Sequence, residues 1–330
     1  MALRILSLTA VALGLGAVLT GCGAQYRATK AETAYPPTGN FVEVTGGRVH
    51  YVQAGQGPDL VLLHGAGGNL RDFTFDLMGQ LTDRYRVTAF DRPGLGYTDR
   101  VPGVATGPTA TEGDGPLAQA AMLREAAENI GITDPIVLGH SFGGIVAYAW
   151  AVEGLDQASP VNAKALVSVS GVTMPWPGDL APYYRINGSA FGGVVTVPLI
   201  TALVPDSVVR ERIDSTFAPQ PAPEGYAEYI GAGLTLRPES FRANIRQVNT
   251  LRPKVVALSA RYPALTLPVE IVHGTADTTV PIHIHAEEVI KIVPSAHLTR
   301  LEGIGHMPHH TNPDAVIDAI DRAAERAGLR

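Results

Sequence analysis

The chain has 330 residues, a formal net charge of −6 at pH 7 and an isoelectric point near 5.9. With no basic patch in the sequence, this composition argues against nucleic acid as a partner. The length is sufficient for one α/β core with an inserted lid, and the sequence shows neither internal repeats nor low-complexity tracts.

The N-terminal segment combines one early positive charge, Arg4, with an apolar run from Ile5 to Thr20. This run is shorter than the roughly 18 residues of a membrane-spanning helix, so it favours a signal peptide. It continues into Leu19-Thr20-Gly21-Cys22, which resembles a bacterial lipobox. The resemblance implies cleavage after residue 21 and acylation of Cys22, the only cysteine of the chain. A plain secretory signal and an uncleaved anchor are the alternatives.

The segment after this cysteine predicts how the protein is held at the cell envelope. The residue directly after Cys22 is Gly23 and not Asp. The absence of Asp at this position resembles the pattern for outer-membrane sorting in Gram-negative bacteria. Residues 23–40 are polar, contain proline and show no apolar period, so we expect a flexible tether. The predicted location is extracytoplasmic, with a membrane as partner through the lipid on Cys22.

The remainder, 41–330, predicts a single domain. Apolar, β-branched runs alternate with helical periods, a pattern typical of a mostly parallel sheet with helices on both faces. The predicted eight strands cover residues 41–45, 48–54, 59–64, 85–90, 135–140, 164–170, 268–273 and 297–302. The interval at about 172–267 interrupts the alternation, and we expect a mainly helical cap over the active site.

The strand at 135–140 ends in Gly139-His140-Ser141-Phe142-Gly143 and leads into a helical stretch. A tight turn between strand and helix exposes a serine hydroxyl and places it near free helix N–H groups, which favour developing negative charge. This context predicts that Ser141 is a nucleophile. The alternative is an ordinary turn serine.

Two later strands end in turns that carry an acid and a base. Asp277 follows the strand at 268–273, and His306 follows the strand at 297–302. The alternatives are an Asp that only caps its turn, and His309 or His310 in place of His306. The histidines also suggest zinc, but the sequence has neither a helical H-x-x-x-H with a flanking acid nor a CxxC pair, so we expect no metal.

The order serine, aspartate, histidine along the chain is the one expected of α/β-hydrolases. Two further motifs agree: the strand at 59–64 runs into His64-Gly65-Ala66-Gly67-Gly68, and residues 91–96 form a D-x-x-G-x-G loop. On these residues the chain resembles the α/β-hydrolase superfamily over most of residues 41–328. The fold class implied is an α/β-hydrolase fold with a cap.

The resemblance also implies a role for each site residue. Ser141 attacks a carbonyl, His306 takes its proton, and Asp277 orients the imidazole. The backbone N–H groups of Ala66 and Phe142 form the oxyanion hole. The implied function is a serine hydrolase, resembling carboxylesterases, that cleaves a small-molecule ester or lactone through an acyl-enzyme and uses no cofactor.

Several other functions occur on this fold. Haloalkane dehalogenases and epoxide hydrolases are similar in fold but place Asp where this chain has Ser141. Carbon–carbon bond hydrolases and cofactor-free haloperoxidases use similar triads and stay open as alternatives. From another class, a ligand-binding lipoprotein without turnover is possible on the same fold, although every catalytic position holds a competent residue.

Overall fold

The computed structural model describes residues 2–156 and 158–330, and it describes the side chains of residues 16, 18–156 and 158–330. A sheet of eight strands forms the centre of the domain, in the order β1-β2-β4-β3-β5-β6-β7-β8. The pairs β1–β2 and β2–β4 are antiparallel, and all other pairs are parallel. The predicted fold class is confirmed.

Each strand end lies within one residue of its predicted position. The strands are β1 (Asn40–Val44), β2 (Gly47–Ala54), β3 (Asp59–Leu63), β4 (Arg86–Phe90), β5 (Ile136–His140), β6 (Ala165–Val169), β7 (Val269–Gly274) and β8 (Ala296–Leu301).

Helices cover both faces of the sheet because its parallel strands are apolar on both sides. On β3, Val61 and Leu63 join the core cluster with α3 and α4, whereas Leu60 and Leu62 join the cluster with α2 and α14. The helices outside the cap are α2 (Arg71–Thr74), α3 (Pro116–Asn129), α4 (Phe142–Glu153), α12 (Ala286–Ile292), α13 (Pro308–Thr311) and α14 (Pro313–Arg326).

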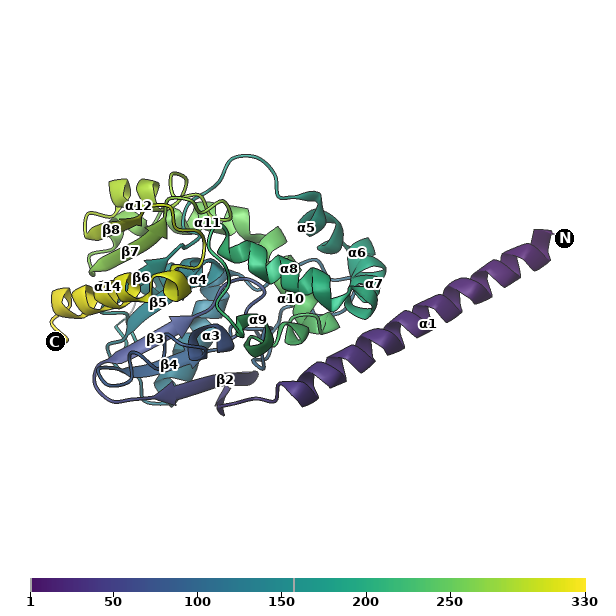
Figure 1. Ribbon diagram of the computed structural model, residues 1–330, viewed down its shortest axis with the longest axis horizontal. Helices are drawn as coiled ribbons and strands as arrows, with labels where there is room; N and C mark the ends of the chain where they lie inside the picture. The colour runs from purple at the N-terminus through teal and green to yellow at the C-terminus, as the bar shows by residue number, and fades with distance from the viewer. Residues whose placement is uncertain (1, 157) are drawn as a thin grey trace.

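The interval between β6 and β7 is helical, as expected, and its helices gather beside the sheet (Figure 1). Its last part differs from the prediction of a cap to about residue 267, because Leu251, Val255 and Leu258 of α11 pack in the main core against α4. The elements are α5 (Pro182–Asn187), α6 (Ala190–Val194), α7 (Thr196–Leu203), α8 (Asp206–Phe217), α9 (Tyr226–Tyr229), η1 (Ala232–Leu234), α10 (Pro238–Asn249), α11 (Leu251–Ser259) and η2 (Tyr262–Ala264).

The N-terminal segment is one long helix, α1 (Ala2–Ala34), which projects away from the domain (Figure 1). The prediction of a flexible tether is therefore wrong for residues 23–34. Ala24, Ala28 and Ala31 recur at helical spacing and are buried, and α1 contacts α7 and η1. Among the residues whose side chains are described, no helix has the length and apolarity needed to cross a membrane.

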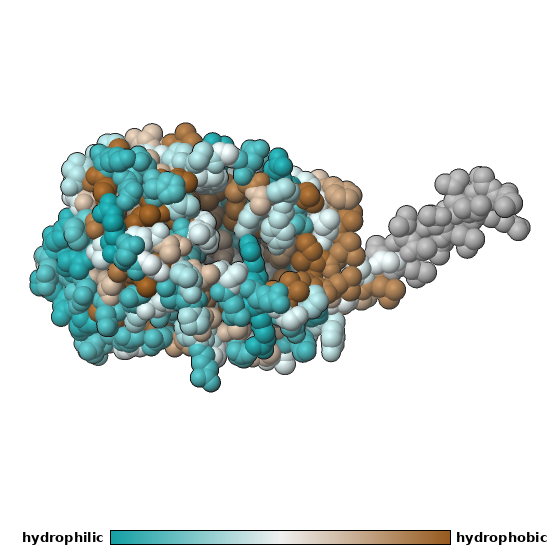
Figure 2. Space-filling view, turned by 45° about the horizontal axis from the view of Figure 1, so that its top comes forward, coloured by the Kyte–Doolittle hydropathy of each residue, from teal (hydrophilic) through white to brown (hydrophobic). Residues whose placement is uncertain are grey.

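The molecular surface is polar over most of the view in Figure 2, and apolar residues gather at the end of the domain from which α1 projects. That end belongs to cap helices α6 and α7, whose exposed side chains are mainly apolar.

Candidate active site

Four turns meet at one edge of the sheet, because the parallel strands β3, β5, β7 and β8 all end there. In open α/β sheets, ligands bind at the carboxyl ends of the strands. The turns after β3, β5, β7 and β8 carry the predicted site residues Ala66, Ser141, Asp277 and His306. The structure therefore brings the four predicted segments to a single edge.

Ser141 occupies a strained turn between β5 and α4. Its backbone has φ 52° and ψ −118°, a region that residues other than glycine rarely adopt. Its N–H donates to Val169 O at 3.0 Å, which ties the turn to β6. A Cβ on Gly143 would lie 2.0 Å from Leu63 O, so the close packing of α4 on β3 requires the glycine two positions after the serine.

Asp277 and His306 are hydrogen-bonded to each other. His306 Nδ1 donates to Asp277 Oδ2 at 2.7 Å, and both side chains are buried. Because a carboxylate only accepts, the proton of a neutral imidazole is held on Nδ1, and Nε2 is left as an acceptor. The structure thus gives His306 the tautomer that a general base for a serine hydroxyl needs.

The Asp277 carboxylate is fixed by groups on its own loop. Its Oδ1 accepts the backbone N–H groups of Thr279 and Val280, each at 2.9 Å. Burial alone raises the pKa of Asp277, but hydrogen bonds from His273 and His306, the His306 charge and the Val280 N–H together lower it below its ordinary value. The acid is therefore ionised at neutral pH. His273 of β7 also faces this carboxylate, with its Nε2 3.4 Å from Asp277 Oδ2.

The turn after β3 approaches the nucleophile closely. A Cβ on Gly65 would lie 3.1 Å from the Cβ of Ser141. Any larger residue at position 65 would therefore shift Ser141 or the turn itself. Ala66 is exposed in this turn, and Phe142 begins α4. Neither of their N–H groups has a hydrogen-bond partner among the described residues. Both amides are thus available to an oxyanion.

A buried arginine holds this turn in place. Arg92 Nε donates to His64 O at 2.7 Å, and its Nη2 donates to Gly65 O at 3.0 Å. The guanidinium carbon lies 4.3 Å from the Phe142 ring centroid. Burial lowers the pKa of Arg92 to about 9, although the nearby Asp114 opposes this shift. Arg92 belongs to the D-x-x-G-x-G loop at 91–96, and its side chain contacts both segments of the predicted oxyanion hole.

The cap contacts the same turn from outside. Gly67 N–H donates to Asn244 Oδ1 of α10 at 2.7 Å, and Thr235 Oγ1 donates to Gly67 O at 2.6 Å. The position of the turn after β3 therefore depends on the cap as well as on the core.

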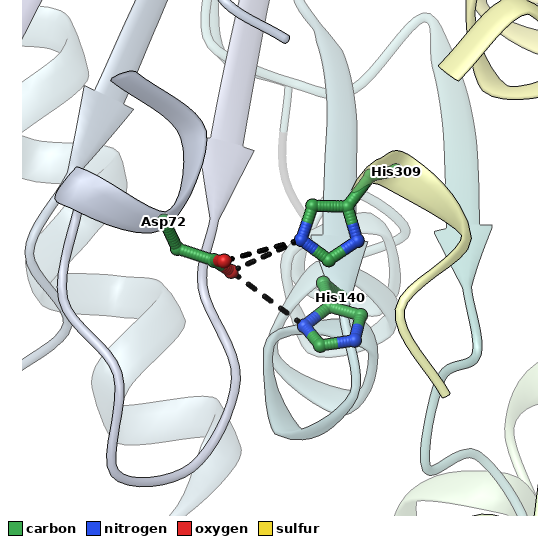
Figure 3. A group of neighbouring side chains, drawn as sticks. All are labelled: Asp72, His140 and His309. Atoms are coloured by element: carbon green, nitrogen blue, oxygen red, sulfur yellow. Dashed lines mark hydrogen bonds and ion pairs between the residues drawn. The ribbon is translucent and has the colours of Figure 1, made fainter. Parts of the chain in front are cut away.

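Beneath the site lies a buried group of polar side chains around Asp72 of α2 (Figure 3). Asp72 accepts from His309 Nε2 at 3.2 Å, from His310 Nε2 at 2.9 Å and from the Tyr226 hydroxyl at 2.8 Å. Burial raises the pKa of Asp72, but the charges and hydrogen bonds of His309 and His310 outweigh this effect and hold it well below its ordinary range. We call these four residues, with His140, the Asp72 network.

His140 connects the Asp72 network to the catalytic histidine candidate. Its Nε2 donates to the carbonyl oxygen of His306 at 3.0 Å, because a carbonyl can only accept. Its Nδ1 faces Asp72 Oδ2 at 3.7 Å (Figure 3). The residue directly before Ser141 in the chain therefore fixes the backbone of His306.

The same group is the candidate for a metal, since ligand atoms of Asp72, His140 and His309 lie within 4.8 Å of one another. A metal-bound histidine ordinarily donates its second ring N–H to an acceptor. His140 has such an acceptor in His306 O, but His309 Nδ1 is buried with no partner. Because Asp72 already has three donors, we interpret the group as a hydrogen-bonded support, and the absence of a metal stays a prediction.

Comparison with known proteins identifies the family of this chain. The family model described as alpha/beta hydrolase family matches residues 60–319. The chain belongs to the alpha/beta hydrolase family. That match covers the strands and turns of all four predicted site segments, and it confirms the family resemblance seen in the sequence.

Three similar proteins illustrate the range of this family. The uncharacterized protein Rv2715 of Mycobacterium tuberculosis is 29% identical over 87% of this chain and 81% of its own length. A solved epoxide hydrolase, CorEH, has a TM-score of 0.69 at 23% identity, covering 89% of this chain and 99% of its own. A solved bacterial membrane phospholipase A has a TM-score of 0.64 at 20% identity and covers 99% of both chains.

Proposed function

We propose that the protein is a serine hydrolase that cleaves a carboxylic ester or lactone. The observation that carries this proposal is the hydrogen-bonded pair of His306 and Asp277, located at the same sheet edge as a serine in a strained turn. Nucleophile, base and orienting acid are the three parts of this type of acyl transfer.

In the proposed reaction, Ser141 Oγ attacks the carbonyl carbon while His306 Nε2 takes the hydroxyl proton. The N–H groups of Ala66 and Phe142 stabilise the negative charge on the carbonyl oxygen. The imidazolium then gives its proton to the leaving alkoxide, which departs as an alcohol. A water molecule, deprotonated by His306, attacks the acyl-enzyme and releases the carboxylic acid.

The residue at position 141 supports ester hydrolysis over epoxide hydrolysis, the reaction in the name of the similar structure CorEH. In that class and in haloalkane dehalogenases the attacking group is a carboxylate, whereas this chain has Ser141. A serine attack on an acyl carbon yields an ester intermediate that water can hydrolyse. The phospholipase A neighbour bears the name of an enzyme class that also cleaves carboxylic esters.

We also propose that the protein is held at the bacterial envelope by acylation of Cys22. The thiol is exposed on α1, and Leu19-Thr20-Gly21-Cys22 matches a lipobox. The fold likeness to the membrane phospholipase A extends over 99% of this chain, so it includes the N-terminal region. Several acyl chains give stable membrane anchoring.

Labelling with a fluorophosphonate probe tests the proposed nucleophile. The full chain is expected to form one covalent adduct, and Ser141→Ala and His306→Ala are expected to lose it. Ser215→Ala, at an exposed serine of α8, serves as the control and should label normally. An adduct that persists in Ser141→Ala would overturn the assignment, and a native chain that fails to label would favour the ligand-binding alternative.

A further inference from the structure

Helix α7 presents an apolar stripe to solvent. Val195, directly before the helix, and Leu199 and Leu203 within it recur every four residues, and they are 39%, 41% and 65% exposed. A surface helix of a globular protein normally places polar residues on its outer side. The inner side of α7 is also apolar, since Val197 packs against Phe241 and Ile245 of α10. Helix α7 therefore packs its inner side on apolar residues of α10, whereas the stripe of Val195, Leu199 and Leu203 is open to solvent.

The stripe continues onto the neighbouring short helices. Ile186 of α5 is 49% exposed, Phe191 and Val194 of α6 are 64% and 50% exposed, and α6 packs beside α7. We call these three residues, with the stripe of α7, the apolar cap face. Figure 2 shows apolar residues gathered at this end of the molecule. Contiguous exposed apolar surface marks an interaction site, whereas scattered apolar residues do not.

The proposed lipid attachment point lies beside this face. A Cβ on Gly23 would lie 3.5 Å from the Cβ of Ala202, the penultimate residue of α7. Four residues later, Arg27 donates to Val204 O at 2.5 Å and to Asp206 Oδ1 at 2.9 Å. These contacts fix α1 against the end of α7, and Cys22, whose thiol is exposed, directly precedes the contacting residue Gly23.

We propose that the apolar cap face rests on the lipid bilayer into which the acyl chains of Cys22 insert, so that the enzyme takes amphiphilic esters from that bilayer. This inference rests on the proposed function, both the ester hydrolysis and the acylation. The occupant follows from continuity: acyl chains that leave from position 22 enter a bilayer at the edge of the face. An apolar face at that position buries its side chains in the same lipid surface.

The contacts within the cap connect this face to the chemistry. Val197 links α7 to α10, and Asn244 of α10 accepts from the N–H of Gly67, next to Ala66. The face is therefore one helix away from the turn that supplies an oxyanion donor. A lipid surface on α7 places an ester in the bilayer near the cap that covers the active site.

An environment-sensitive fluorophore on single cysteines tests the position of the bilayer. In the acylated full chain Cys22 is blocked, so an introduced cysteine is the only labelled thiol. The variants are Leu203→Cys and Phe191→Cys, with Val256→Cys as the matched control, because Val256 is 52% exposed on α11, which packs on the core. Each protein is placed in vesicles of phosphatidylethanolamine and phosphatidylglycerol.

Fluorophores at 203 and 191 are expected to shift to the blue and to be quenched by lipids with brominated acyl chains, whereas the fluorophore at 256 reports water. Emission typical of water at all three positions would overturn the docking proposal while leaving acylation intact. Labelling of Cys22 in the native chain would show instead that the acylation on which the proposal rests is absent.

Substrate preference gives a second measurement. With Leu199→Asp and Leu203→Asp combined, the ratio of turnover on a bilayer-embedded ester to turnover on a short water-soluble ester should fall by about tenfold or more. Val256→Asp should leave this ratio unchanged. An unchanged ratio in the double variant would contradict the delivery of substrate through the apolar cap face. Absence of fluorophosphonate labelling in the native chain would instead contradict the hydrolase proposal itself.

Discussion

Asp277 shows how a single carboxylate sets the chemistry of its neighbour. Its Oδ1 is saturated by two backbone N–H groups of its loop, so Oδ2 is directed to His306 Nδ1. Substituting Asn keeps the shape but replaces this acceptor with an N–H₂ donor. The imidazole must then carry its proton on Nε2, where it cannot accept from a serine hydroxyl.

We therefore expect Asp277→Asn to lower kcat for ester hydrolysis by about 10³- to 10⁴-fold, with little change in KM. The measurement is steady-state kinetics on a short-chain ester together with thermal unfolding. Asp318→Asn, at an exposed carboxylate of α14, is the control and should keep native kinetics. A folded Asp277→Asn protein with native kcat would show that the acid lies elsewhere.

Residue patterns in the sequence predicted Ser141, Asp277 and His306 as site residues because each follows a strand and stands in a characteristic turn. They did not indicate Arg92 or Asp72. Arg92 contacts the turn at 64–65, and Asp72 contacts His309, which is 237 positions away. Such contacts depend on the packing of distant segments and leave no periodic signal.

At the scale of elements, the sheet was predictable and the N-terminal helix was not. Parallel strands read as short apolar runs bounded by turns, so their ends could be located closely. Residues 23–34 look polar, but alanines at 24, 28 and 31 follow a helical period. Small residues allow close approach, and a Cβ on Gly233 of η1 would lie only 2.9 Å from the Cβ of Ala31.

This close approach makes the docking of α1 sensitive to side-chain volume. Ala31→Glu places a long charged side chain in a contact that has no space for it, so we expect α1 to detach from the cap. Trypsin should then cleave after Arg27 or Lys30 about tenfold faster or more, because local opening exposes the backbone. Thr29→Glu, at an exposed position of the same helix, should keep the native rate. Equal cleavage rates in the two variants would contradict a docked α1.

For the whole molecule, the boundary of the cap is a feature that the sequence pattern alone does not determine. Helix α11 follows α10 almost without interruption, and its composition does not distinguish a cap helix from a core helix. Its assignment to the core depends on contacts of Leu251, Val255 and Leu258 with the main cluster. The sequence therefore predicted the order of the elements but not which of them cover the sheet.

Stability as a function of pH is another property of the whole molecule, because several buried histidines are neutral in the folded state. Burial, as the largest cause, lowers the pKa of His64, His285 and His309 to about 4 in each case. The hydrogen bonds agree: His64 Nε2 accepts from Arg92 N–H, and His285 Nδ1 accepts from Met174 N–H. Protonation removes these acceptors.

The sign of the effect follows from proton binding. Between about pH 6.5 and pH 4 the unfolded chain binds protons at these histidines and the folded chain does not, so the free energy of unfolding falls as pH falls through this window. Each histidine contributes a loss of up to about 3 kcal/mol. Asp72 and Asp277 have depressed pKa values, so their contribution persists through this window and is lost only at lower pH.

We expect the midpoint of urea unfolding to decrease steadily from pH 6.5 to pH 4.5. Burial also lowers the pKa of His140 well below its ordinary value, which makes four such histidines. In His285→Asn, whose amide oxygen can accept from the same N–H groups without titrating, the decrease should be smaller by about one quarter, because one of these four histidines no longer binds a proton on unfolding. His283→Asn, two positions away and exposed, should show the native decrease. A native midpoint that stays constant between pH 7 and pH 4.5 would mean that these histidines are protonated within the folded protein, and the hydrogen bonds accepted by His64 and His285 would have to be reassigned.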